Sequence, residues 1–185
     1  LLMVQSSNEI IACPANWAQI GPQNGSGAAA TAASNRLALC WKRSVGAGES
    51  APTVADTDDH TMAAISAYSG AAQTGDPFQF LSSGTKATAS VNFIGTGGNT
   101  FVVNSLVVVV AGTVGADSTS TVQCGAATNS DLASVTERLD SFDADGTGGG
   151  FCLEDGTKVI AGTVGNTTLT EATSTADAWT TLALL

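Results

Sequence analysis

Residues 106–112 read LVVVVAG, and this stretch decides the fold of the chain. It holds five consecutive large aliphatic side chains, four of them β-branched, before Ala111 and Gly112. Because β-branched side chains are restricted at χ1, they fit a pleated sheet better than a helix. A continuous apolar run of this length predicts a strand covered on both faces, at the centre of a layered β structure. It is too short to cross a bilayer, which takes roughly 18 apolar residues or more.

The overall composition is that of a folded domain. Of the 185 residues, 12% are charged and 5% are aromatic, and the mean hydropathy is +0.20. Disordered chains have low hydrophobicity, so this balance predicts an ordered protein. We expect residues 1–185 to form a single domain, since β-sandwiches of this length commonly do. The chain starts with LLMV, which resembles the middle of a strand, so residues before Leu1 are expected to be missing.

The charge balance excludes two classes of partner. Six basic residues stand against 16 acidic ones, which gives a net charge of −10. Nucleic-acid binding depends on Lys and Arg that neutralise phosphates, so this chain would be repelled by a nucleic acid. An anionic membrane is disfavoured for the same reason. Neither a nucleic acid nor a membrane is therefore expected as a partner.

Several further apolar segments alternate with turn residues, as in an all-β protein. We predict an antiparallel β-sandwich of the jelly-roll type with about eight to eleven short strands. Asp155-Gly156 between extended segments predicts a hairpin with a type I′ turn, and Asn129 or Ser130 could cap a single helical turn. Strands are expected at 1–5, 16–20, 36–43, 61–68, 85–93, 118–123, 135–140, 151–154, 157–161 and 179–185, besides the central one.

One pentapeptide occurs twice. AGTVG stands at 111–115 and again at 161–165, each time after an aliphatic segment and before Thr-rich sequence. A solenoid would need several copies at a fixed period. We interpret the two copies as similar turns at strand exits, and not as a duplicated domain.

The four cysteines, Cys13, Cys40, Cys124 and Cys152, are widely spaced and include no C-x-x-C pair. With one histidine in the chain, a zinc site is disfavoured. Two disulfides are possible in an oxidising compartment. Free buried thiols are the favoured interpretation, because the predicted core is large enough without cross-links.

Catalytic motifs are scarce, and neither a catalytic residue nor a cofactor is expected. The only histidine, His60, follows Asp56, Asp58 and Asp59. A histidine beside acids can serve in a catalytic triad or bind a metal. A polar residue at a strand entry is the favoured interpretation here.

Asp140, Asp143 and Asp145 are weak candidates for calcium ligands. The sequence from Asp143 to Gly146, DADG, is similar to the first half of a calcium loop, where oxygen ligands surround a tight glycine turn. The glycines at 148–150 supply no side-chain oxygen to such a loop. A solvated acidic turn is therefore favoured over a metal site.

The three tryptophans, Trp17, Trp41 and Trp179, could form a sugar-binding platform if they were exposed together. Each stands within an apolar strand segment, so packing in the core is the favoured interpretation.

The order of several segments resembles a family of small β-sandwich structural proteins of tailed bacteriophages and prophages. Each segment is short, and the likeness rests on their order along nearly the whole chain. At the position of Cys40 that family usually has an aromatic or aliphatic residue, which argues against a disulfide role for Cys40. The segments are 16–20, 36–43, 67–70, 75–78, 104–108, 135–140, 161–165 and 178–185.

The resemblance implies a non-enzymatic virion protein that decorates the capsid or belongs to the tail. Its partners would be copies of itself and other virion structural proteins, in a homo-oligomer. Two alternatives remain open: an extracellular or cell-surface filament subunit or adhesin that assembles by strand exchange, and a glycan-binding module. An exposed sheet edge could accept a strand from a neighbour in the first alternative.

Overall fold

The computed structural model describes residues 1–6, 9–26, 34–55, 61–86, 90–95, 97–100, 102–115, 125, 127–143 and 149–185. This part of the chain is all-β and contains no helix, and so none that could cross a membrane. Four of its thirteen strands have only two or three residues, which leaves nine longer ones. The strands are β1 (Leu2–Ser6), β2 (Ala18–Gln19), β3 (Asn24–Ser26), β4 (Asn35–Trp41), β5 (Thr61–Ile65), β6 (Phe78–Lys86), β7 (Ser90–Gly95), β8 (Asn99–Thr100), β9 (Ser105–Gly115), β10 (Ala133–Asp143), β11 (Gly149–Lys158), β12 (Gly162–Thr163) and β13 (Thr167–Leu184).

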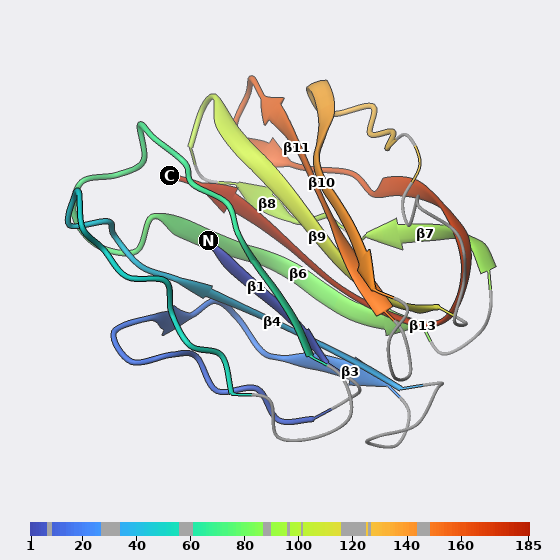
Figure 1. The fold of residues 1–185 in the computed structure, drawn as a ribbon. Helices are drawn as coiled ribbons and strands as arrows, with labels where there is room; N and C mark the ends of the chain where they lie inside the picture. The colour runs from blue at the N-terminus through green and yellow to red at the C-terminus, as the bar shows by residue number, and fades with distance from the viewer. Residues whose placement is uncertain are drawn as a thin grey trace.

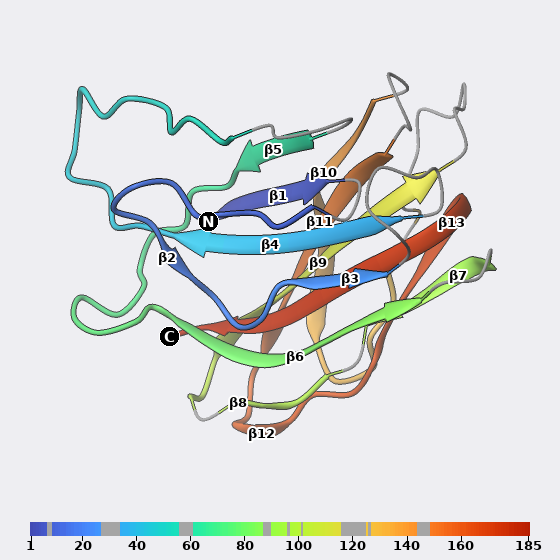
Figure 2. The same ribbon diagram turned by 90° about the horizontal axis from the view of Figure 1, so that it is seen from below.

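Two antiparallel sheets pack against each other, as predicted for a β-sandwich (Figure 1). Sheet A has the order β2-β4-β1-β5, and β3 also pairs with β4. Sheet B has the order β10-β11-β9-β13-β6, and β7 also pairs with β13. The short strands β8 and β12 form a separate ribbon. In Figure 2 the strands of sheet A cross those of sheet B at an angle.

The central strand lies where the sequence predicts it. β9 is an inner strand of sheet B, between β11 and β13. Val108 and Val110 belong to the core between the two sheets, whereas Val109 and Ala111 belong to a cluster on the other face of sheet B. All four are at most 2% exposed. The continuous apolar run is therefore explained by burial on both faces.

The main core fills the space between the sheets. Large aliphatic side chains from β1 and β4 meet those from β9, β11 and β13 there. A third cluster, which includes Leu2 and Val4, covers the outer face of sheet A. The buried members of the main core are Leu1, Met3, Ile20, Leu37, Leu39, Val108, Val110, Leu153, Ala178 and Leu182.

A buried polar link joins the two sheets at Gly112. The amide nitrogen Nδ2 of Asn35 donates to the carbonyl oxygen of Gly112 at 2.6 Å. Nε2 of Gln5 in turn donates to Oδ1 of Asn35 at 3.1 Å. A Cβ at position 112 would come within 3.2 Å of Cγ of Gln5. The aliphatic run meets a glycine there because the two sheets approach closely.

The predicted hairpin at Asp155-Gly156 is wrong. Both residues lie inside β11, where they pair with Val108 and Val107 of β9. Asp155 is buried in an ion pair with Arg138 of the neighbouring strand. A tertiary partner therefore holds this dipeptide in an extended strand, against its local preference for a turn.

The two copies of AGTVG have different conformations, so the interpretation as two similar turns is wrong. The copy at 111–115 forms the second half of β9. The copy at 161–165 includes the two-residue strand β12 and irregular backbone on both sides of it. The predicted strand at 118–123 lies outside the described residues.

The prediction of free thiols is wrong, as is the argument against a disulfide role for Cys40. Cys13 and Cys40 form a disulfide with a Cα–Cα distance of 5.9 Å. It ties the segment that follows β1 to the buried strand β4, at the cluster on the outer face of sheet A. Cys152 is disulfide-bonded as well, and Cys124 lies outside the described residues.

Candidate interaction surface at one end of the sandwich

The residues singled out for metal binding or catalysis are only partly described. Asp140 and Asp143 both lie on the edge strand β10, opposite Cys152 and Gly149 of β11. Asp145 lies outside the described residues, as do His60, Asp56, Asp58 and Asp59. Within the described ranges, no three His, Cys, Asp or Glu side chains are grouped so that they could hold a metal ion. The calcium candidates therefore stay a prediction.

The three tryptophans lie apart, each half-buried against a different cluster. Trp41 packs on the core between the sheets. Trp17 packs on the outer face of sheet A, and Trp179 on the far face of sheet B. They do not form a common platform.

Strand ends from both sheets meet at one end of the sandwich. In sheet A, β1 begins where β4 and β5 end. In sheet B, β13 ends where β6 and β9 begin, and β11 ends beside the start of β9. Leu1 and Leu184 line the same hollow, so these strand ends lie together. Figure 1 shows the two chain termini near each other at this end, on the left.

The hollow has a volume of about 700 Å³ and lies between the loop after β4 and the segment that joins β5 to β6. Apolar side chains form much of its lining, among them Ile65, Pro77 and Leu184. Tyr68 and Phe78 also line it, with their rings edge to face at a centroid distance of 6.3 Å. The hydroxyl of Tyr68 is buried without a hydrogen-bond partner among the described residues. Burial, together with the negative charge of Asp155, raises the pKa of this hydroxyl.

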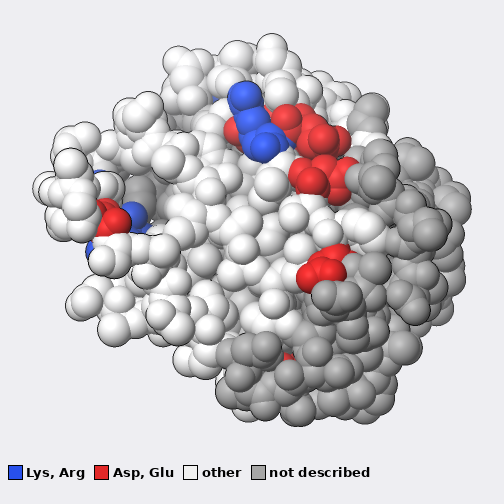
Figure 3. Space-filling model, viewed as in Figure 1, with Lys and Arg blue, Asp and Glu red and all other residues white. Residues whose placement is uncertain are grey.

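The charged side chains at the hollow are largely satisfied within the protein. Lys42 forms an ion pair with Glu49. Nη2 of Arg43 donates to the carbonyl oxygen of Gly75 at 2.8 Å, and the guanidinium lies 5.7 Å from the ring centroid of Trp41. Figure 3 shows basic and acidic atoms together at the hollow on the left. Because these charges are already paired or hydrogen-bonded, the hollow favours a neutral, apolar partner over an ion.

Beside the hollow, two turns expose large aliphatic side chains. Val102 and Val103, between β8 and β9, are 40% and 58% exposed; Val159 and Ile160, between β11 and β12, are 53% and 70% exposed. The start of β9 pairs with the end of β11, so the two turns are neighbours. We call these four side chains the apolar tip. Exposed aliphatic groups that gather in this way are typical of interaction sites.

The apolar tip is not evident from the sequence. The sequence pattern predicts Val159 and Ile160 in the second strand of a hairpin, where one of the two would be buried. The available signal was a pair of aliphatic residues next to turn chemistry at both sites. Asn104, which follows Val103, has a φ of 61°, a conformation that asparagine tolerates better than most residues.

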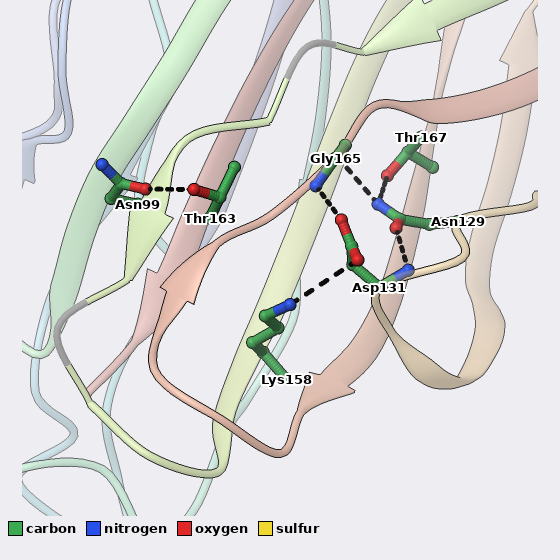
Figure 4. A network of polar contacts seen from close by, with 7 residues as sticks. All are labelled: Asn99, Asn129, Asp131, Lys158, Thr163, Gly165 and Thr167. Carbon is green, nitrogen blue, oxygen red and sulfur yellow. Dashed lines mark hydrogen bonds and ion pairs between the residues drawn. The ribbon is translucent and has the colours of Figure 1, made fainter.

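Hydrogen bonds hold the two turns of the apolar tip in place. Oγ1 of Thr100 and Oγ of Ser105 are 2.7 Å apart and close the first turn. The second turn is fixed by the ribbon of β8 and β12, where Oγ1 of Thr163 donates to Oδ1 of Asn99 at 3.0 Å (Figure 4). A surface that is rigid before binding loses less entropy when it binds.

The segment after β12 is anchored by Asn129 and Asp131 (Figure 4). Nδ2 of Asn129 donates to the carbonyl oxygen of Gly165 at 3.0 Å and to Oγ1 of Thr167 at 2.9 Å. Oδ2 of Asp131 accepts from the backbone N–H of Gly165 at 2.6 Å, and Oδ1 lies 3.8 Å from Nζ of Lys158. The predicted helical turn here is a simple turn, in which Oδ1 of Asn129 accepts from the N–H of Asp131 at 2.9 Å.

We expect Asn129→Ala to lower the free energy of unfolding by about 1–2 kcal/mol, because the buried hydroxyl of Thr167 and the part-buried carbonyl of Gly165 lose their hydrogen-bond donor. Urea unfolding followed by circular dichroism measures the loss. Ser130→Ala, at an exposed position in the same turn, is the matched control and should change stability by less than about 0.5 kcal/mol. Equal losses in the two variants would contradict the anchoring role of Asn129.

Charge is unevenly distributed over the molecule. Among the described residues at the end with the hollow and the apolar tip, three basic and three acidic side chains cancel, although the whole chain carries −10. An acidic region lies on β10 and β11, with Glu137, Asp140, Asp143, Glu154 and Asp155, the last of which is paired with Arg138. We define the end face as the hollow, the apolar tip and the six charged residues around them: Lys42, Arg43, Lys158, Glu49, Asp76 and Asp131.

Glu154 has the most strongly perturbed environment in the acidic region. Its side chain is buried, and Oε1 has no hydrogen-bond partner within the described part of the chain. Burial first, and then the charges of Glu137, Asp140 and Asp155, raise its pKa to about 7. The carboxyl group therefore gains or loses its proton near neutral pH.

Comparisons with known proteins add no identification. The chain matches no protein family, no curated protein and no solved structure. The end face is thus characterised by its geometry and chemistry alone.

Proposed function

We propose that this protein is a non-enzymatic structural subunit of a bacteriophage virion, either a capsid decoration or a tail appendage. It would act by docking on copies of itself or on a major structural protein. The proposal rests on one observation: at the end face, exposed aliphatic side chains lie beside a hollow and the local charges cancel. The order of segments that resembles phage structural proteins supports the same role.

The distribution of charge favours contacts at the end face. In a virion many copies lie close together, and a net charge of −10 on each opposes contact. At physiological salt, electrostatic repulsion is screened over about 8 Å. Repulsion therefore persists between surfaces in direct contact, which lie closer than this. An interface between such copies must therefore combine local neutrality with apolar surface, and the end face has both properties.

The proposal is tested on particles. Mass spectrometry of purified virions from cells that carry the gene should detect the protein at a fixed ratio to the major capsid or tail protein. Particles from a strain with the gene deleted provide the control. Finding the protein only in the soluble fraction, with none in purified particles, would overturn the proposal.

A glycan-binding module is the second candidate, because Trp17 and Tyr68 both line the hollow. Aromatic rings beside polar groups are suited to sugar rings. Titration of the protein with glucose, galactose, N-acetylglucosamine and maltose, followed by tryptophan fluorescence, tests this candidate. A saturable change that Trp17→Phe abolishes would support it, and the absence of any change with all four sugars would count against it.

Strand exchange at β1, as in the filament alternative, has no free edge to use. β1 is hydrogen-bonded on both sides, to β4 and β5. An incoming strand at this position would have to displace one of them.

A further inference from the structure

We propose that two copies of this chain associate through their end faces, with the apolar tip of each copy inserted into the hollow of the other. The two copies would be related by a two-fold axis. This inference rests on the proposed assembly function and names the surface that carries it. It concerns the purified protein alone, so it can fail while the virion assignment stands.

The position of the apolar tip and the hollow on the same end suits a two-fold arrangement. In a two-fold interface the same surface is used by both copies, and each contact occurs twice. A projection and a depression side by side on one surface can satisfy each other in this way. A straight head-to-tail filament would be favoured by elements on opposite ends of the molecule. Here both lie at one end, because β9 and β11 present the apolar tip at the end where β13 closes the hollow.

The chemistry of the two elements matches. The apolar tip consists of four aliphatic side chains, and Ile65, Pro77, Phe78 and Leu184 line the hollow. Ile65 is itself 52% exposed. A stable interface buries roughly 800 Å² on each partner. The apolar tip alone is smaller than this, but in the two-fold arrangement each copy contributes both an apolar tip and a hollow.

Electrostatics favours a second copy over a strongly charged partner. The charges of the end face cancel, with Lys42 paired to Glu49 and Lys158 beside Asp131. Two end faces can therefore meet without net repulsion, whereas the acidic regions on β10 and β11 would repel each other. Like charges placed opposite each other oppose such a contact. The end face is consequently a described surface on which two copies of this acidic protein can meet without net repulsion.

Sedimentation velocity of the full chain over about 1 µM to 1 mM tests the proposal. The wild-type protein should pass from monomer to dimer with rising concentration and form no larger species. Ile160→Asp should weaken dimerisation by about 100-fold or more, because it places an unpaired carboxylate at both contacts. Ile10→Asp is the matched control, since Ile10 is 83% exposed on the loop after β1, away from the end face. It should dimerise like the wild type.

A second pair of variants tests the hollow. Ala67 lines the hollow and is exposed, whereas Ala63 is exposed on β5 but does not line it. Ala67→Trp should block insertion of the apolar tip and weaken dimerisation by at least about tenfold, whereas Ala63→Trp should not. Circular dichroism and urea unfolding verify that all variants are folded.

Mixing the variants tests the two-fold arrangement itself. Ile160→Asp protein keeps an intact hollow, and Ala67→Trp protein keeps an intact apolar tip. An equimolar mixture should therefore form a heterodimer with one intact contact and associate more tightly than either variant alone. A wild-type protein that stays monomeric at 1 mM, an Ile160→Asp variant that dimerises like Ile10→Asp, or a mixture no tighter than its components would each overturn the proposal.

Discussion

Removal of the Cys13–Cys40 disulfide should lower the free energy of unfolding by about 3–4 kcal/mol. The bond joins residues 27 apart in the sequence, and opening it releases the loop-closure entropy of that segment in the unfolded chain. It also frees the segment after β1 from the cluster that covers the outer face of sheet A. Cys13→Ala, Cys40→Ala and the double variant should each show the loss in urea unfolding.

The three variants together separate the cross-link from the side chains. Because either single substitution removes the bond, the double variant should be no less stable than the worse single one. Variants are preferable to a reducing agent, which would also open the disulfide of Cys152. Losses below about 1 kcal/mol in all three would show that the bond contributes little.

The second large effect is a dependence of stability on pH that comes from Glu154. Its pKa is raised to about 7 in the folded protein, from 4.5 in an unperturbed carboxyl group. Between these values the folded state binds more protons than the unfolded state. Stability is therefore highest below about pH 4.5 as far as this group is concerned, and falls as the pH rises to 7.

Glu154→Gln removes this titration and should raise the free energy of unfolding at pH 8 by about 1–3 kcal/mol. At pH 4.5 the variant and the wild type should differ little, because Glu154 is then protonated in the folded protein. Urea midpoints measured from pH 4.5 to 8 give the two curves. Other acids titrate in both proteins, so the difference between the curves isolates Glu154.

Glu137→Gln is the matched control for this experiment. Glu137 lies directly opposite Glu154 on β10 and is exposed. Removing the charge of Glu137 should relieve only its repulsion of Glu154. The increase in the free energy of unfolding at pH 8 should therefore be smaller than for Glu154→Gln. If Glu154→Gln is instead no more stable than the wild type at any pH from 4.5 to 8, the carboxylate of Glu154 is stabilised by a partner and the prediction is wrong.

The layered architecture could be predicted from the sequence because its signals are local. The run that ends at Gly112 has no polar position, so a strand made of it must be covered on both faces. The alternation of β-branched segments with Gly, Asn and Pro predicted β1, β4, β5 and β10 approximately. Most of β6 and residues 167–178 of β13 were not predicted as strand. The need for glycine at position 112 could not be predicted from the sequence. It arises because the side chains of Gln5 and Asn35, from the other sheet, pack against this position.

Predictions failed where a distant partner outweighs a local preference. Asp155-Gly156 favours a turn by itself, yet Arg138 binds Asp155 through Nε at 2.9 Å and both residues stay in β11. Cys13 and Cys40 carried no spacing signal, because their pairing follows from the course of the chain over the outer face of sheet A. The apolar tip was missed for a related reason: whether Ile160 is buried depends on where its strand ends.

The sequence by itself determined that this chain is an acidic, all-β, layered protein, because side-chain branching, turn residues and net charge are properties of short segments. Only the tertiary structure decided which strand ends meet, and therefore that a hollow, an apolar tip and a neutral set of charges share one end. That juxtaposition depends on strand order and register, which join residues far apart in the chain. The same pentapeptide is a strand at 111–115 and mostly irregular at 161–165, since its neighbours in space differ.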